Sequence, residues 1–129
     1  MTGTLRLFGA TRRGVPVIVG HADRAGLATL AGDVGREASL DVLDSWSIVS
    51  IGRADGSGAT LHALGWRVGQ VNTWVTSPLC AADLVGGAVR TSSGKVYTLG
   101  EPDAPGLHPL LRDHLAYALR TWGFDDVQG

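Results

Sequence analysis

Residues 86–100 read GGAVRTSSGKVYTLG, and the fold class of the chain depends on what this stretch forms. Its glycines, its hydroxyl side chains and the pair Gly94-Lys95 are typical of a phosphate-binding loop. Such a loop also needs a glycine five positions before Gly94, a hydroxyl residue after Lys95, and a helix downstream. The sequence has Val89 and Val96 at those two positions. We therefore exclude a phosphate-binding loop here.

The same stretch has the composition of a β-hairpin. Residues 96–99 (VYTL) are β-branched or aromatic, which is typical of a strand, and residues 89–91 (VRT) precede the turn. Between them, Ser92-Ser93-Gly94 forms a three-residue turn in which glycine supplies the positive φ that the geometry needs. The stretch thus predicts two short antiparallel strands.

Outward from this hairpin, most of the chain repeats the pattern of short strands and glycine-rich turns. The 19 glycines are about twice the usual share, as expected of a chain with many tight turns. Further strand-like segments, apolar or alternating, are residues 4–8, 15–19, 45–51, 59–68, 70–76 and 79–84.

Two segments have helical spacing instead. Asp23 can cap a helix, but Gly26, Gly32 and Gly35 weaken it by about 1 kcal/mol each relative to alanine. Its apolar face consists of Leu27, Leu30, Ala31 and Val34. Pro109 begins a stronger helix that ends at Gly123, a residue suited to the left-handed C-terminal cap, with Phe124 folding back on the last turn. The apolar stripe of this second helix is Leu111, Leu115, Ala118, Leu119 and Trp122.

These segments predict an α+β fold in one domain, residues 1–129. We expect a mostly antiparallel sheet of about six to eight short strands, arranged as hairpins or a meander. The C-terminal helix and one weaker N-terminal helix pack against it.

Composition and charge exclude several classes of function. Eleven basic and twelve acidic residues give a net charge of −1, so nucleic acid and anionic membranes are not expected as partners. Arg12-Arg13 in the first turn has no aromatic neighbour in sequence, which also disfavours nucleic-acid binding. The absence of a long apolar run predicts no signal peptide and no membrane span, hence a cytoplasmic protein. The single cysteine, Cys80, is expected to be a small buried thiol.

The strongest candidate for a partner-binding surface is a cluster of aromatic and polar residues on either side of Gly69-Gln70. If the flanking segments pair, the cluster comprises Trp66, Arg67, Asn72 and Trp74. Tryptophan and arginine dominate the energetics of protein interfaces. Tryptophan is also a common core residue, so at least one of the two is expected to pack inside.

An alternative site is a pocket between sheet and helix, formed by one chain or by a dimer. His62 shares a strand face with Trp66, and Asp83 on a later strand can complete the lining. On this interpretation the protein is a small α+β enzyme or a ligand carrier. The competing interpretation is that His62 is a half-buried histidine with a satisfied hydrogen bond.

Catalytic and metal-binding patterns are absent from the sequence. Ser77, Ser92 and Ser93 lie in turns without the G-x-S-x-G pattern of a nucleophile. His108 and His114 are six positions apart, too far round a helix to chelate one ion. We therefore expect no catalytic residues, no metal and no cofactor.

Thr76-Ser77-Pro78 together with residues 89–100 resembles a hairpin found in small proteins of mobile elements. The resemblance covers about a fifth of the chain, and it implies no activity. The first hypothesis is accordingly a small accessory or inhibitory protein that binds another protein, or its own copies, without chemistry of its own.

Overall fold

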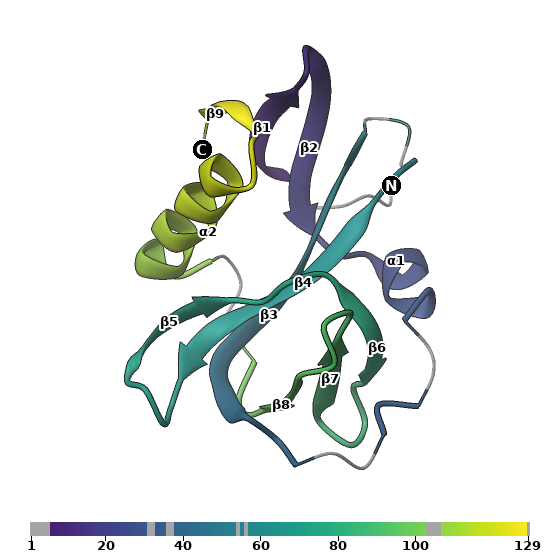
Figure 1. The fold of residues 1–129 in the computed structure, drawn as a ribbon, viewed down its shortest axis with the longest axis vertical. Helices are drawn as coiled ribbons and strands as arrows, with labels where there is room; N and C mark the ends of the chain where they lie inside the picture. The colour runs from purple at the N-terminus through teal and green to yellow at the C-terminus, as the bar shows by residue number, and fades with distance from the viewer. Residues whose placement is uncertain are drawn as a thin grey trace.

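The computed structural model describes residues 6–30, 33–35, 38–53, 55, 57–102 and 107–128. Within them the chain forms one sheet and two helices (Figure 1). The helices are α1 (Arg24–Ala28) and α2 (Pro109–Thr121). The strands are β1 (Arg6–Arg12), β2 (Val15–His21), β3 (Asp41–Arg53), β4 (Thr60–Arg67), β5 (Asn72–Val75), β6 (Leu79–Asp83), β7 (Ala88–Thr91), β8 (Val96–Leu99) and β9 (Asp125–Gln128). None of the described helices is long and apolar enough to cross a membrane.

The predicted α+β class and the mostly antiparallel sheet are confirmed. Strands that follow one another in sequence pair antiparallel from β1 to β5 and again from β6 to β8. The meander is only partly confirmed, because two pairings join strands that are distant in sequence. β8 lies parallel to the beginning of β3, and β9 returns to pair with β1.

The long strand β3 bends and thereby divides the sheet into two regions. Ser45 has a positive φ of 49°, and the pairing of β3 with β4 shifts between Asp44 and Ser47. A β-bulge of this kind bends the bulged strand. Beyond the bulge β3 pairs with β2, whereas before it β3 pairs with β8. We call the part formed by β1, β2, β9 and the end of β3 the upper region, and the part formed by β5 to β8 and the start of β3 the lower region.

The core of the upper region lies between the sheet and α2. The helix begins at Pro109, as predicted, and buries Leu111, Leu115, Ala118 and Leu119. Gly123 has the predicted left-handed conformation, with φ of 92°. Phe124 is buried, and its N–H donates to the carbonyl of Leu119. The local capping signals therefore set both ends of this helix.

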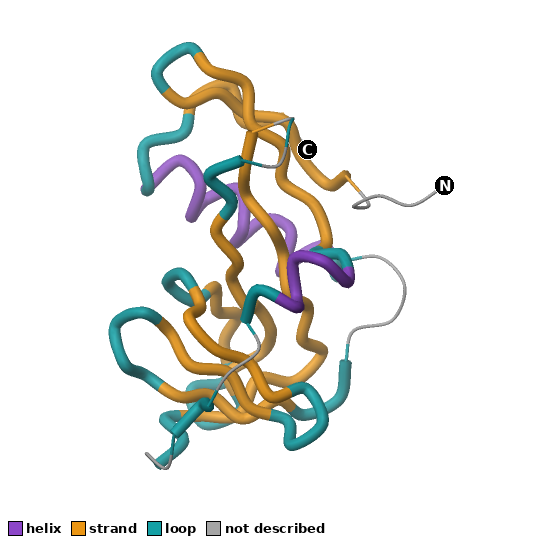
Figure 2. Tube along the Cα trace, turned by 90° about the vertical axis from the view of Figure 1, so that its right-hand side faces the viewer, coloured by secondary structure: helices purple, strands orange, loops and turns teal. Residues whose placement is uncertain are grey.

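The lower region curls around a second core (Figures 1 and 2). Tyr97, Leu43 and Val89 from three different strands are fully buried in it. Thr76 extends the pairing of β5 with β4, because its N–H donates to the carbonyl of Ala63 and its hydroxyl accepts from the N–H of the same residue. The opening hairpin lies here as predicted: β7 and β8 pair around Gly94, whose φ is 91°.

The predicted N-terminal helix is much shorter than its apolar pattern indicated. Asp23 caps it as expected, accepting from the N–H of Gly26 at 2.7 Å, but α1 stops at Ala28. Leu27 and Leu30 pack on the lower core, so the apolar residues are used without a helical continuation. Glycine is a poor helix former, which explains the early end. Ala31 lies outside the described residues, as do residues 4–5 of the first predicted strand.

Three further expectations are corrected. Cys80 is exposed on β6 rather than buried, although its Sγ lies 3.4 Å from the carbonyl oxygen of Thr91. β3 begins at Asp41, four residues before the alternating pattern that indicated it. Residues 125–128, for which the sequence predicts no strand, form β9.

Candidate functional site

The four residues of the predicted partner-binding cluster are brought together on one hairpin, β4–β5. In its register Trp66 lies opposite Thr73 and Arg67 opposite Asn72. Because side chains alternate along a strand, Trp66 lies on one face of the hairpin, and Arg67 and Trp74 lie on the other. The guanidinium of Arg67 stacks on the Trp74 ring, 4.5 Å from its centroid.

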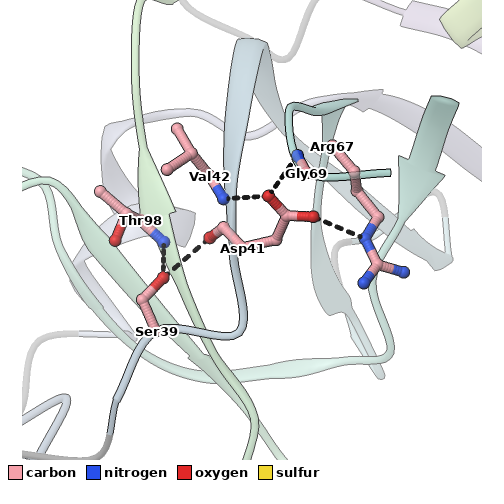
Figure 3. A network of polar contacts seen from close by, with 6 residues as sticks. All are labelled: Ser39, Asp41, Val42, Arg67, Gly69 and Thr98. Atoms are coloured by element: carbon pink, nitrogen blue, oxygen red, sulfur yellow. Dashed lines mark hydrogen bonds and ion pairs between the residues drawn. The ribbon is translucent and has the colours of Figure 1, made fainter. Parts of the chain in front are cut away.

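The carboxylate of Asp41 fastens this hairpin to the beginning of β3 (Figure 3). Its Oδ1 accepts from the N–H of Gly69 at 2.9 Å and from the N–H of Val42 at 2.7 Å, and its Oδ2 lies 3.4 Å from Nε of Arg67. The side chains of Asp41 and Arg67 are only 8% and 13% exposed. Hydrogen bonds from Gly69, then Val42 and Arg67, lower the pKa of Asp41 below its ordinary value of 3.8.

The network continues from Asp41 to β8. The hydroxyl of Ser39 donates to the carbonyl oxygen of Asp41 at 2.8 Å and accepts from the N–H of Thr98 at 3.1 Å (Figure 3). Strand pairing adds to this connection, since Asp41 lies opposite Tyr97 in the parallel ladder. The start of β3 thus holds both the hairpin and β8.

Two valines project from the loop that joins β4 to β5, residues 68–71. The side chains of Val68 and Val71 are 55% and 82% exposed. Val71 also has a φ of 52°, a conformation that β-branched residues rarely adopt. Its N–H donates to the carbonyl of Arg67 at 2.7 Å, and the N–H of Val68 donates to Val42 at 3.0 Å. We call residues 68–71 the valine loop.

All four tryptophans are half-buried, so none belongs entirely to the core or entirely to the surface. Trp46 donates from its ring N–H to Gly100 at 2.9 Å, and Trp122 stacks on His62 with 4.8 Å between ring centroids. Trp66 lies edge-on to His108 at the start of α2. Trp74 differs from the others, because its buried ring N–H has no hydrogen-bond partner.

The three residues of the alternative pocket have different surroundings. His62 is buried; its Nδ1 lies 2.9 Å from the carbonyl oxygen of Thr76 and its Nε2 2.9 Å from the hydroxyl of Thr60. A carbonyl only accepts, so the proton of the neutral ring is on Nδ1. Burial lowers the pKa of His62 below its ordinary value of 6.5. Asp83 is exposed and accepts from the N–H of Gly86 in the β6–β7 turn.

A cleft of about 510 Å³ lies elsewhere, and its described lining includes none of these three residues. It lies between the β1–β2 turn, the β3–β4 turn and Phe124. The structure here corrects one expectation from the sequence. Arg12 does have an aromatic neighbour, since its guanidinium lies 5.1 Å from the centroid of the Phe124 ring.

Two further histidines, His108 and His114, have structural roles. His108 caps α2 through its ring, which accepts from the N–H of Leu110, and Nδ1 of His114 lies 2.7 Å from the hydroxyl of Thr73. Within the described part of the chain, no group of three or more His, Cys, Asp or Glu residues could hold a metal ion.

Comparison of the chain with models of known protein families, with curated proteins and with solved structures finds no match in any of the three. The functional argument therefore rests on the geometry of the molecule.

Proposed function

We propose that this chain is a cytoplasmic protein-binding module without chemistry of its own, and that the β4–β5 hairpin is its contact surface. The surface consists of the valine loop together with Arg67, Asn72 and Trp74, which share one face of the hairpin. Trp66 lies on the other face, edge-on to His108. The observation that carries the proposal is an exposed, apolar and conformationally strained loop that a carboxylate from another strand holds in place.

Exposure of the valine loop is the first step of the argument. Exposed single apolar residues are ordinary. Here, however, two exposed valines are the first and last residues of one four-residue loop, next to an arginine that stacks on a tryptophan. Arginine and tryptophan are the residue types that most often carry the binding energy of an interface. Val68 and Val71 supply the apolar contact area next to them.

Rigidity is the second step. Ordering a loop upon binding costs free energy, and a loop that is already ordered avoids this cost. Asp41 binds the N–H of Gly69 and the Nε of Arg67, so both the loop and the stacked arginine are fixed before a partner arrives.

Strain at Val71 is the third step. A non-glycine residue at positive φ costs about 1–2 kcal/mol, and glycine or asparagine would avoid most of it. Because Val71 is 82% exposed, burial of its side chain within the chain does not compensate for this cost. A contact with a partner gives the valine a function at this position.

The test compares capture of partners by matched baits from an extract of the cells that encode the chain. The baits are the wild type, a Val68→Ser/Val71→Asn variant, and a Val85→Ser control in the β6–β7 turn, where the valine is fully exposed. Asparagine tolerates positive φ, so the double variant keeps its fold, which its melting temperature verifies.

We expect a protein captured by the wild type and by the control to bind the double variant at least about tenfold more weakly. Equal capture by all three baits contradicts the proposal, as does the absence of any protein enriched by the wild type over the double variant. Light scattering of the same three proteins tests whether the partner is a second copy of this chain.

A further inference from the structure

The cleft at the end of the upper region is a second candidate site, independent of the valine loop. Its walls are the β1–β2 turn and the β3–β4 turn, which lie toward the top of the view in Figure 1, whereas the β4–β5 hairpin lies at the lower left. Its volume of about 510 Å³ falls within the range of small-molecule sites.

Cationic side chains dominate the polar part of the lining. Arg12, Arg13 and Arg53 line the cleft, and no aspartate or glutamate does so among the described lining residues. Within the described residues, no ion pair joins any of these arginines to a carboxylate. A chain with a net charge of −1 thus gathers three positive charges around one cleft.

Two carboxylates close in sequence to the lining residues, Asp55 and Asp126, have other partners. Asp55, close to Arg53 in sequence, accepts from the hydroxyl of Ser57 at 2.6 Å and from its N–H at 2.9 Å. These two bonds are the main reason why the pKa of Asp55 lies below its ordinary value of 3.8, and the charge of Arg53 contributes less. Asp126, on β9, lies 3.4 Å from the hydroxyl of Thr11. Neither acid lines the cleft.

The rest of the lining is largely apolar. Val17, Ile51 and Phe124 are buried core residues that also line the cleft. The stacking of Arg12 on Phe124 positions one guanidinium beside this apolar part. The cleft therefore combines cationic groups with a surface that favours an apolar body.

Arg13 occupies a position that arginine does not favour. With Gly14 it forms the two-residue turn between β1 and β2, and both residues have positive φ, 51° and 79°. Asparagine or aspartate is the common choice before glycine in such a turn. An arginine at this position places its charge beside the cleft at the expense of turn stability.

We propose that this cleft binds a small molecule that carries a phosphate group on an apolar body. Guanidinium groups bind phosphate oxygens through paired, charge-assisted hydrogen bonds, and three arginines line the cleft. The apolar lining takes the remainder of the ligand. A polyanion such as nucleic acid is disfavoured, because the chain as a whole has no excess of positive charge.

The test is calorimetric titration of the full chain with phenyl phosphate and with inorganic phosphate at one fixed ionic strength. Phenyl phosphate is expected to bind about tenfold more tightly than inorganic phosphate, because only its ring can use the apolar lining. The variant Arg12→Gln/Arg53→Gln is expected to bind phenyl phosphate at least about tenfold more weakly. Arg24→Gln on α1, an exposed arginine that does not line the cleft, is the matched control and should bind as the wild type does.

Unchanged melting temperatures establish that the variants are folded. The proposal is overturned if the wild type binds neither phosphate at millimolar concentration, if the double variant binds as well as the wild type, or if both phosphates bind equally. Tighter binding of a single-stranded oligonucleotide than of phenyl phosphate, lost in the same variant, also overturns it. The valine loop is intact in every variant, so these results leave the proposed protein-binding function unaffected.

Discussion

The β1–β2 turn and the valine loop share one backbone feature and differ in almost every other respect. Arg13 in the first has a φ of 51° and Val71 in the second has a φ of 52°. The first turn is short, cationic and formed by its own two residues. The second is longer, apolar, and held by Asp41 from a different strand. The comparison teaches that one conformation is maintained by local geometry in the first case and by a tertiary contact in the second.

The largest expected effect on this comparison comes from adding one methyl group to each of the two hairpins. Gly65→Ala in β4 should destabilise the chain by about 3 kcal/mol, because the new Cβ would lie 2.8 Å from the carbonyl oxygen of Asp44 and 3.3 Å from the Cα of Trp46. Gly14→Ala meets nothing within 4 Å and adds only the cost of positive φ, about 1 kcal/mol. Urea unfolding measures both. If both variants lose the same free energy of unfolding, the β4–β5 hairpin depends on contacts with neighbouring strands no more than the β1–β2 hairpin does.

Removing the charge of Asp41 tests the tertiary contact directly. Asp41→Asn should lower the melting temperature and speed amide exchange at Gly69 by about tenfold or more, since the acceptor shared by Gly69 and Arg67 is weakened. The wild type should show the same loosening in acid. The folded-state pKa of Asp41 is lowered, so its contribution is present above pH 3.8 and is lost as the pH falls through the folded-state pKa.

Asp55→Asn is the matched control, because Asp55 also accepts from a backbone N–H but does so within its own turn. Exchange at Gly69 should be unchanged in this variant. If Asp55→Asn loosens Gly69 as much as Asp41→Asn does, the specific role of Asp41 is refuted.

The pH dependence of stability below neutral pH should depend on His62, whose ring bonds to Thr60 and to the carbonyl of Thr76. Thr60 lines the cleft and bonds to Nε2 of this buried ring. Because burial lowers the folded-state pKa of His62 below 6.5, the free energy of unfolding should fall as the pH decreases through 6.5 and on toward the folded-state pKa. Denaturant unfolding across this range measures the slope.

His62→Gln should flatten the slope even if it lowers stability overall. His114→Gln should remove the part of the pH dependence that is left in His62→Gln, since partial burial also lowers the pKa of His114. A slope unchanged in His62→Gln would assign the pH dependence to other groups.

The smallest expected effects come from replacing Arg13 and Val71, the two residues that share a positive φ, by a residue that tolerates it. Arg13→Asn and Val71→Asn should each stabilise the chain by about 0.5–1 kcal/mol, because asparagine adopts this conformation more readily than arginine or valine. Thermal unfolding detects both changes. A loss of stability in Val71→Asn would mean that the valine contributes contacts that its exposure does not indicate.

Sequence reasoning succeeded where the signals are local. Pro109 and Gly123 mark the two ends of α2, and the spacing of its leucines identifies the buried face. The hairpin around Gly94 follows from turn chemistry in the same way. The four residues of the predicted partner-binding cluster lie on one hairpin because its two strands are adjacent in sequence, and their binding role stays a prediction.

Most of the features that were missed depend on residues far apart in the chain, and the early end of α1 is a local exception. The parallel pairing of β3 with β8 and the contact of Arg12 with Phe124 have no signature in either segment alone. The role of Asp41 is of this kind, since its partners Arg67 and Gly69 belong to another hairpin. The cleft requires two turns and Phe124 to meet, so the sequence showed its arginines singly and not as a set.

The parallel ladder between β3 and β8 has a consequence for how the chain acquires its structure. Strands β1 to β4 can pair as they leave the ribosome, because each lies next to its predecessor. One edge of residues 41–43 must wait until β8 has been synthesised. Contacts between such distant segments form late and slowly. A nascent chain therefore carries an unpaired strand edge until β8 arrives, and a chaperone that covers such edges would act during this interval.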